Sequence, residues 1–387
     1  MDIGKFRSET PGCDHVVHFN NAGAALMPQP VLDAQIDHLR LEARIGGYES
    51  AHDAAEATRE THRAIGEMLG ANPGEIAVVE NATRAWGAAF YGMRFSPGDR
   101  ILTANASYAS NYIAMLQVAR ETGALIDVAP DDEFGQADPS GLEALITPRT
   151  RLIAVTHVPT NGGLVNPASE IGAIAQRHGI PFLLDACQSA GQMPLNVDEI
   201  GCDMLSATGR KFLRGPRGTG FLYVRESLIP HLEPPFLDLH AAEWIDASRY
   251  EPHPDHRRFE TWEGNVAGKI GLGVAVRYAL DVGLGGIQDR VEALATRLRD
   301  ELGEVGCTVR DLGRRKSGIV TFTHPGFEAA PLQSALRTRG FNTSVAVPSS
   351  SRLDACRRAL PPMVRASVHY YNTEDEIGRF VAALGDL

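Results

Sequence analysis

The sequence predicts an α/β fold: a large domain built on a mostly parallel, seven-stranded sheet, and a small α+β domain at the C-terminal end. Short apolar runs alternate with helical stretches through the first two thirds of the 387 residues, a pattern that favours a parallel sheet covered by helices. Several runs are continuously apolar, such as LIAV at 152–155 and the FLL at 182–184 that precedes Asp185. Such runs are typical of strands buried on both faces.

The strands of the large sheet are predicted in chain order, with helices such as Asn81–Met93 and Pro167–His178 between them. Residues 230–260 are rich in proline, histidine and charge, so we expect a long loop with short pieces of structure there. The predicted strands are Glu75–Val79, Arg100–Thr103, Leu125–Val128, Arg151–His157, Pro181–Leu184, Asp203–Ala207 and Gly220–Val224.

Two long helices are predicted next, Val266–Val282, which Gly283 ends, and Ile287–Val305. They lead into a smaller unit of alternating elements. We expect an N-terminal segment over residues 1–20, a large domain over 21–262 and a small domain over 263–387, with the N-terminal segment packed on either domain. The elements predicted for the smaller unit are a strand at Ser317–Thr323, a helix at Ala330–Arg339, a strand at Val364–His369 and a helix at Glu374–Leu384.

Composition excludes several classes of function. The chain has 37 Lys+Arg against 48 Asp+Glu, a net charge of −11, which argues against a nucleic-acid partner. No apolar run approaches the roughly 18–20 residues of a membrane span, and MDIGKFRSET lacks the apolar core of a signal peptide. The five scattered cysteines have no CxxC spacing, so we expect a cytoplasmic protein without disulfides or a zinc ribbon. His253 and His256 are better explained by a solvated loop than by a metal site.

The nucleotide-binding glycine patterns are missing. Gly271-Leu-Gly273 lies inside a predicted helix, and Gly283-Leu-Gly285-Gly286 is a helix stop followed by a turn. No G-x-x-x-x-G-K-[ST] sequence occurs. Nicotinamide and P-loop nucleotide chemistry are therefore not expected.

Three strand ends carry residues with chemistry. Ala82 and Thr83 begin a helix directly after a strand, where free backbone N–H groups can bind a phosphate. Asp185 ends an apolar strand and needs a cationic partner there. Lys211 follows a strand in a turn rich in glycine and arginine, and its neighbours Arg210 and Arg214 are expected to favour the neutral amine. Each feature alone is also explained by a helix cap or a solvated loop. Together they match a site for pyridoxal 5′-phosphate (PLP).

With these motifs, the chain resembles the class V aminotransferase-like, fold-type I PLP enzymes. The resemblance extends from Phe19-Asn-Asn-Ala-Gly-Ala to Arg365-Ala-Ser-Val-His-Tyr-Tyr-Asn372-Thr. This group contains cysteine desulfurases and isopenicillin N epimerase. Short fragments, among them Gly46-Gly-Tyr48 and Arg210-Lys-Phe-Leu-Arg-Gly-Pro-Arg-Gly218, are most similar to hercynylcysteine sulfoxide lyases.

The resemblance implies a role for each site residue. Lys211 is expected to form the Schiff base with the cofactor, and Asp185 to pair with the ring nitrogen. Tyr108 is expected to stack on the ring as a catalytic residue, and Arg365 and Asn21 to bind the substrate, with Arg365 on its α-carboxylate. The other residues implied to bind the cofactor are Ala82, Thr83, Asn161, Gln188, Thr208 and Arg210, of which Asn161 and Gln188 face the phenolic oxygen.

Three departures from the desulfurases stand out. Those enzymes carry a persulfide-forming cysteine on a mobile loop before the Arg365 segment, whereas here Cys356 lies closer to Arg365, in a predicted helix. Their histidine before the lysine is Arg210 in this chain. Their threonine that reaches the partner subunit's phosphate is replaced by Glu263.

We therefore expect a PLP enzyme that removes the Cα proton of a small amino-acid substrate, with β-elimination by a C–S lyase as the leading hypothesis. An aminotransferase or an epimerase of class V is the alternative, and a true cysteine desulfurase is less favoured. A non-catalytic binding protein on the same fold is a further alternative. The family places its cofactor at a subunit interface, so a homodimer is expected.

Overall fold

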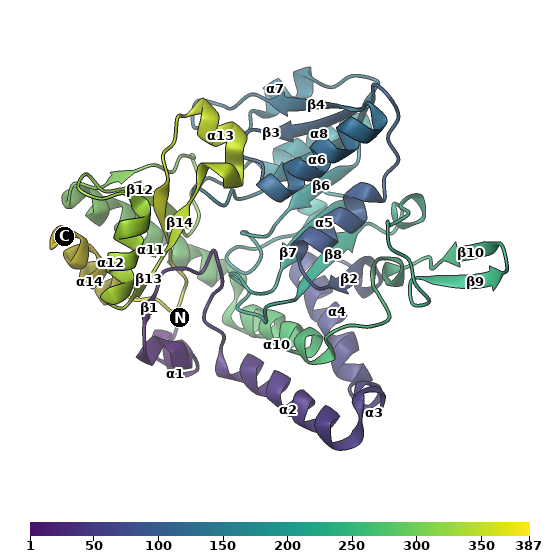
Figure 1. Cartoon of the computed structure of the whole chain (residues 1–387), viewed down its shortest axis with the longest axis horizontal. Coiled ribbons are helices and arrows are strands. Elements are labelled where there is room, and N and C mark those ends of the chain that lie inside the picture. The colour runs from purple at the N-terminus through teal and green to yellow at the C-terminus, as the bar shows by residue number, and fades with distance from the viewer.

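The computed structural model describes all 387 residues, and a seven-stranded sheet lies at the centre of its larger part (Figure 1). The strand order is β2-β8-β7-β6-β5-β3-β4. Neighbours are parallel except on both sides of β8, so the predicted sheet is confirmed. The strands are β2 (Ile76–Val79), β3 (Arg100–Ala104), β4 (Leu125–Ala129), β5 (Thr150–Thr156), β6 (Phe182–Asp185), β7 (Met204–Thr208) and β8 (Gly220–Val224).

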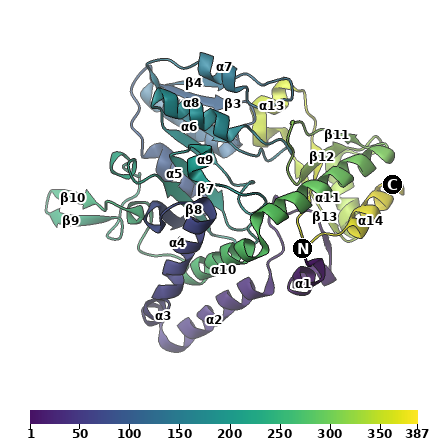
Figure 2. The same cartoon turned by 180° about the vertical axis from the view of Figure 1, so that it is seen from behind.

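Helices cover both faces of this sheet. Side chains alternate between faces along a strand, so Leu183 of β6 joins one apolar cluster while its neighbours Phe182 and Leu184 join the other. The two views of Figures 1 and 2 show the two helix layers. One layer is α5 (Ala82–Tyr91) and α6 (Ala109–Thr122), and the other contains α4 (Ala55–Leu69), α8 (Ala168–His178), α9 (Val197–Ile200) and α10 (Val266–Val282).

A small four-stranded sheet of order β11-β12-β15-β14 lies beside the large one, and all its pairings are antiparallel. Its apolar cluster joins α11, α12 and α14 to the strands. The elements are α11 (Leu284–Glu304), β11 (Thr308–Val309), β12 (Ile319–Thr323), α12 (Ala329–Thr338), β13 (Phe341–Asn342), β14 (Ser344–Ala346), η5 (Pro348–Ser351), α13 (Arg352–Arg357), β15 (Met363–Ser367) and α14 (Glu374–Gly385).

Helix α10 packs with the large domain. It lies against α4 and α2 (Gln29–Ile45), and its Gly273 allows this approach because a Cβ there would come within 2.4 Å of the Thr61 hydroxyl. In α11, Ile287 joins the large cluster and Leu294 the small one. The predicted boundary at residue 263 is thus too early in terms of packing, and the change of domain falls within α11.

Helices α10 and α11 are the only candidates for a membrane span. No single helix of the chain is long and apolar enough to cross a bilayer; these two helices pass such a test only as a pair, with a bend of 79° between them.

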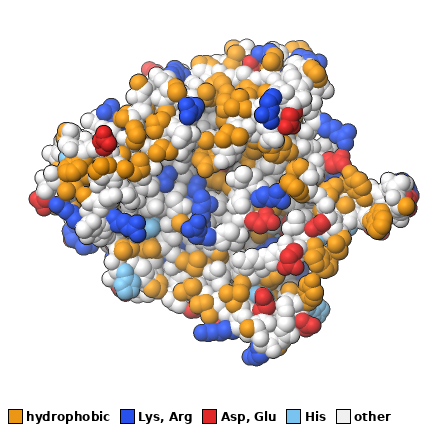
Figure 3. All heavy atoms as spheres, in the orientation of Figure 1, with side chains coloured by type: hydrophobic (Ala, Val, Ile, Leu, Met, Phe, Trp, Pro, Cys, Tyr) orange, Lys and Arg blue, Asp and Glu red, His pale blue; other side chains and the backbone are white.

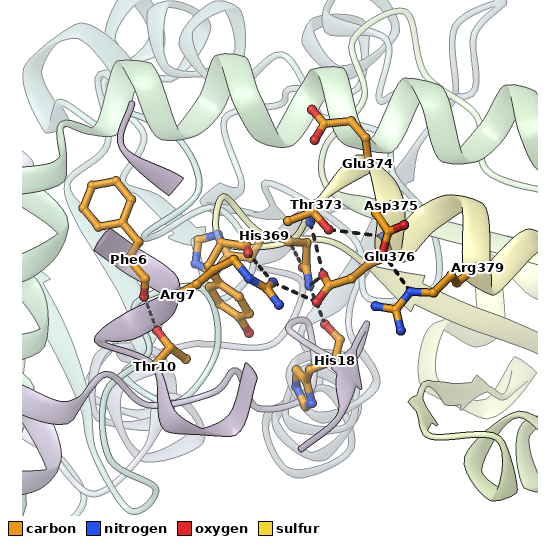
Figure 4. Close-up of polar contacts among 12 residues, drawn as sticks. Phe6, Arg7, Thr10, His18, His369, Thr373, Glu374, Asp375, Glu376 and Arg379 are labelled. Carbon is orange, nitrogen blue, oxygen red and sulfur yellow. Dashed lines mark hydrogen bonds and ion pairs between the residues drawn. The ribbon is translucent and has the colours of Figure 1, made fainter. Parts of the chain in front are cut away.

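The N-terminal segment contacts both domains. It contains α1 (Ile3–Ser8) and η1 (Pro11–Asp14), followed by β1 (Val17–His18), which pairs with β13 of the small domain. The Arg7 Nη1 atom lies 2.8 Å from Glu376 Oε1 of α14 (Figure 4). The Phe6 ring meets the edge of Tyr278 from α10. The segment therefore ties α10 to the last helix.

Residues 230–260, predicted as a loop, contain a hairpin that projects from the molecule (Figures 1 and 3). It consists of β9 (Ala242–Asp246) and β10 (Arg249–Pro252). Trp244 on it is 79% exposed and Tyr250 is also exposed. The remaining short elements are α3 (Gly47–Asp53), η2 (Pro73–Glu75), α7 (Pro139–Ala144), η3 (Ile229–His231) and η4 (His256–Phe259).

Helix α8 packs on the end of α9 through a glycine. A Cβ at Gly172 would lie 1.8 Å from the carbonyl oxygen of Ile200, so Gly172→Ala should lower the free energy of unfolding by about 3 kcal/mol through overpacking. Urea unfolding measures the change. Gly378→Ala is the matched helical control, because nothing lies within 4 Å of its Cβ, and a gain of about 0.5–1 kcal/mol is expected there. Equal effects of the two substitutions would contradict the packing.

Candidate active site

The chemistry-bearing residues meet at one edge of the large sheet. Strands β5, β6 and β7 are parallel to one another, and β2 runs in the same direction because two antiparallel pairings separate it from β7. Their carboxyl ends therefore lie at the same edge, where α/β proteins bind ligands. Asp185 ends β6, Thr208 ends β7, and α5 begins just after β2.

Asp185 is 4% exposed and is held by two neutral donors. Asn111 Nδ2 donates to its Oδ2 at 2.7 Å, and the Cys187 N–H donates to its Oδ1 at 3.0 Å. The carboxylate makes no ion pair with a side chain of the protein. Asn111 is a site residue that the sequence did not predict, although its place three residues after Tyr108 at a helix start puts both residues on one face.

Lys211 lies in a tight turn after β7. The Arg214 N–H donates to the Lys211 carbonyl at 2.8 Å, and the Gly215 N–H donates to the Gly209 carbonyl at 2.7 Å. Burial lowers the pKa of the Lys211 amine; the neighbouring Cys187 and Asp185 act against this. The charges of Arg210 and Arg365 lower that pKa further. The contribution of Arg214 stays a prediction; its Nε atom donates to the Leu26 carbonyl.

The start of α5 forms a cradle for an anion. The Asn81 side chain caps this helix by accepting from the Arg84 N–H at 3.0 Å, while the N–H groups of Ala82 and Thr83 have no acceptor within the helix. Gly220 begins β8 so close to them that a Cβ would lie 3.0 Å from the Ala82 nitrogen. Backbone donors and the positive end of the helix dipole suit a phosphate.

Thr208 and Arg210 flank this cradle. The Arg210 Nη1 atom donates to the Thr208 hydroxyl oxygen at 3.0 Å, and that hydroxyl donates to the Thr219 carbonyl at 3.2 Å. The arginine is thereby fixed next to the strand end, and its remaining donors can reach an anion.

Gln188 and Asn161 lie on the small-domain side of the site. Gln188 Nε2 donates to the Ala22 carbonyl at 3.2 Å and to the Thr160 hydroxyl at 3.3 Å, while its Oε1 is buried without a partner. Asn161 Nδ2 donates to the Val347 carbonyl at 2.8 Å. The Asn161 amide thus links the site to the segment that follows β14.

Arg365 points into the same region from β15. Its Nη1 donates to the Thr160 carbonyl at 3.0 Å and to the Thr160 hydroxyl at 2.8 Å, and its Nη2 lies 3.5 Å from Asn20 Oδ1. The Nε atom is buried and has no acceptor. Burial lowers the pKa of Arg365 to about 10. A guanidinium with a free donor at a site edge is suited to a carboxylate.

Tyr108 and Asn21 differ in their exposure. Tyr108 is 36% exposed at the start of α6, with its N–H donating to the Thr156 hydroxyl at 3.3 Å. Asn21 is completely buried: its Nδ2 donates to the Ser367 carbonyl at 2.7 Å, and its Oδ1 accepts from the Tyr371 hydroxyl. The expected contact of Asn21 with substrate is corrected, because this side chain supports the wall of the site and has no accessible surface.

A cleft of about 1070 Å³ adjoins the cradle at Thr83. Glu263, which stands where the desulfurases have threonine, lines it. Behind its wall, Glu260 lies 2.8 Å from His62 Nε2 and 2.9 Å from Lys269 Nζ. His256 completes a group of possible metal ligands. The Lys269 ammonium already neutralises Glu260, so this cluster is explained as a buried charge network.

The residues present fit PLP. The buried Asp185 carboxylate lacks a cation, which a protonated pyridine nitrogen would supply. The Gln188 Oε1 atom lacks a partner, and the start of α5 offers unpaired donors to a phosphate. The Lys211 amine, with its lowered pKa, is suited to Schiff-base formation.

The fold and this site define a fold-type I PLP-dependent enzyme. The model of the family "Aminotransferase class-V" matches residues 17–380, and the chain belongs to that family. It is 32% identical to a "Probable cysteine desulfurase" of Xylella fastidiosa over 95% of this chain and 90% of the relative. The apo structure of a cysteine desulfurase from Thermococcus onnurineus NA1 superposes with a TM-score of 0.91 at 28% identity, covering 99% of this chain and 97% of that one. The cystine C–S lyase C-DES, solved with cysteine persulfide, shares the fold with a TM-score of 0.88 at 22% identity, over 98% and 99% of the two chains.

Two buried histidines make stability depend on pH. Burial, and then the Arg315 charge, lowers the pKa of His157 from 6.5 to about 4. Burial, and then the Arg214 charge, lowers the pKa of His369 to about 3. Between these values and pH 6.5 the unfolded histidines bind protons that the folded ones do not, so the free energy of unfolding should fall as the pH is lowered from about 6.5 to about 4.

Urea unfolding at pH 7.5, 6, 5 and 4.5 checks this dependence. His157→Gln should reduce the slope, because it removes one of the two groups, whereas replacing the exposed His52 by Gln should leave the slope unchanged. A His157→Gln protein with the slope of the original chain would contradict the assignment.

Proposed function

We propose that this protein cleaves the Cβ–S bond of a cysteine derivative by β-elimination. The observation that carries the proposal is the helical conformation of the segment before Arg365. Its only cysteine, Cys356, lies on α13, and this helix is tied to the large domain by Arg357 Nη1, 2.8 Å from Asp131 Oδ2. A helix fixed in this way differs from a mobile loop that would carry a sulfur-accepting thiol to the cofactor.

Each site residue has one task in this reaction. Bound PLP supplies the electron sink that stabilises negative charge at Cα. The Arg365 guanidinium orients the substrate carboxylate, and the Lys211 Nζ atom, whose pKa burial lowers, takes the proton from Cα. The Asp185 carboxylate holds the proton on the ring nitrogen. The exposed Tyr108 ring covers the site from α6.

The electron pair released at Cα then forms the Cα=Cβ bond as the Cβ–S bond breaks, and the sulfur leaves as a thiolate. Lys211 Nζ lies in the site to return a proton to the departing group. The released enamine reacts with water to give pyruvate and ammonia. The balance is therefore one cysteine derivative and one water to one thiol, pyruvate and ammonia, and no acceptor cysteine is consumed.

The names of the relatives support chemistry at a cysteine sulfur. The sequence relative in Xylella fastidiosa is named a probable cysteine desulfurase, and a neighbour in fold is a cystine C–S lyase. Desulfuration and elimination begin with the same binding of a cysteine amino acid, and differ in whether the enzyme's own thiol takes the sulfur.

Pyruvate release tests the proposal. The PLP-loaded enzyme is expected to form pyruvate from cysteine, cystine or a cysteine S-conjugate, and Lys211→Ala should form none, because the base is lost. Cys356→Ser should retain the full rate. Lactate dehydrogenase coupling measures pyruvate, and amino-acid analysis measures alanine.

Alanine as the main product, with loss of turnover in Cys356→Ser, would establish a desulfurase instead. Conversion of the cofactor to its pyridoxamine form without pyruvate would indicate an aminotransferase, and racemised substrate alone would indicate an epimerase. A loaded enzyme inert toward every amino acid would favour a binding protein.

We also propose that two copies of the chain pair over the 1070 Å³ cleft. Exposed aromatic side chains support this surface: Tyr48, Phe236 and Trp262 line the cleft, and such rings are enriched in interfaces. Because the cleft adjoins Thr83, a partner there would close the phosphate side of the site.

A substitution in the cleft tests the pairing. Trp262→Lys should shift the protein toward monomer in analytical ultracentrifugation and speed the loss of PLP on dialysis, whereas Trp244→Lys on the hairpin, which does not line this cleft, is the comparison. A Trp262→Lys protein that stays dimeric and retains PLP would overturn the placement.

A further inference from the structure

We infer that Arg214 is a positioning residue that fixes the turn bearing Lys211; the inference rests on the proposed role of Lys211. Arg214 is 2% exposed and forms no ion pair with a carboxylate. A buried guanidinium is costly unless its N–H groups find acceptors. The hydrogen-bond acceptors of Arg214 therefore indicate its role.

The Arg214 side chain joins three distant parts of the chain. Its Nε donates to the Leu26 carbonyl at 2.9 Å, its Nη1 to the Tyr370 hydroxyl at 2.5 Å and its Nη2 to the Thr10 hydroxyl at 2.5 Å. The guanidinium also lies 4.4 Å from the centre of the Tyr371 ring, a cation–π distance. The guanidinium thus binds both the N-terminal segment, through Thr10, and the segment that follows β15, through Tyr370.

The backbone of Arg214 closes the lysine turn. Its φ of 60° lies in the left-handed region, which costs energy for any residue with a Cβ. In this conformation its N–H reaches the Lys211 carbonyl at 2.8 Å. Glycine would adopt this φ without strain, so the contacts of the arginine side chain offset the cost of placing it here.

The turn is held at two further points. The Ala25 N–H donates to the Arg210 carbonyl at 2.9 Å. The His369 ring is neutral because burial lowers its pKa, and its Nε2–H donates to the Phe212 carbonyl at 2.8 Å. Residues 210, 212 and 214 are each held by such a contact, so the backbone is fixed on both sides of Lys211. Since a misplacement of about 1 Å can cost about 100-fold in rate, loss of the Arg214 anchor should be felt at Lys211 Nζ.

Three substitutions separate the side chain from the backbone. Arg214→Gly keeps the left-handed turn and removes the anchor, Arg214→Met keeps the volume without donors, and Arg214→Lys keeps the charge with a different donor geometry. Arg217→Met, at an exposed position of the same loop, is the matched control. The rate at which added PLP becomes covalently linked to Lys211 in the apo-protein is measured by absorption and by mass spectrometry after borohydride.

Arg214→Gly and Arg214→Met should slow this linkage at least about tenfold, with faster amide hydrogen exchange over residues 209–215, and Arg214→Lys should recover part of the rate. Arg217→Met should behave as the unmodified protein. Measurement well below the thermal midpoint of each variant separates positioning from unfolding.

Unchanged linkage and exchange in the folded Arg214 variants would overturn the inference. If both Arg214→Gly and Arg214→Met fail to fold, Thr10→Val and Tyr370→Phe each remove one hydrogen bond and carry the same test with the same expectation. If the unmodified protein links no PLP at Lys211, the proposed function fails; the positioning role fails separately when the unmodified protein links PLP and the variants match it.

Discussion

A buried carboxylate without a cation of its own is the constraint on which this site depends. Asp185 ends a strand in the middle of the large sheet and is held by Asn111 and by the Cys187 N–H, both neutral donors. Two such hydrogen bonds orient the charge, but neither donor carries a positive charge of its own in this buried position. A cationic ring nitrogen provides the missing partner, so cofactor binding and the stability of this edge of the sheet are coupled.

The same logic extends outward from Asp185. Lys211 and Arg365 bring two positive groups into the same buried region, and each lowers its affinity for protons under the influence of burial. The amine can become neutral and reactive, whereas the guanidinium remains charged at neutral pH and is available to a carboxylate. The same burial thus makes Lys211 suitable as a base and Arg365 suitable as a receptor for an anion.

Much of this arrangement could be predicted from the sequence, because continuous apolar strands followed by polar residues give both the sheet and its active edge. Phe182–Asp185 predicted a buried strand with a carboxylate at its end, and the structure has both. Contacts between residues far apart in the chain could not be predicted in this way. The sequence predicts Asn21 as a substrate residue, whereas its contacts with Ser367 and Tyr371 make it part of the buried wall of the site. The hairpin at 242–252 was hidden because its exposed strands carry no apolar alternation.

The antiparallel strand β8 has a consequence for how the chain acquires its structure. β2 lies at the edge of the sheet and pairs with β8 alone, so residues 76–79 have no backbone partner until residues 220–224 exist. During synthesis on the ribosome, more than a hundred residues must emerge while this apolar strand waits with both edges open. Such long-range strand pairing slows folding and leaves an apolar, aggregation-prone segment exposed. The helix that later cradles an anion begins at the end of that strand, so the binding edge matures among the last parts of the large domain.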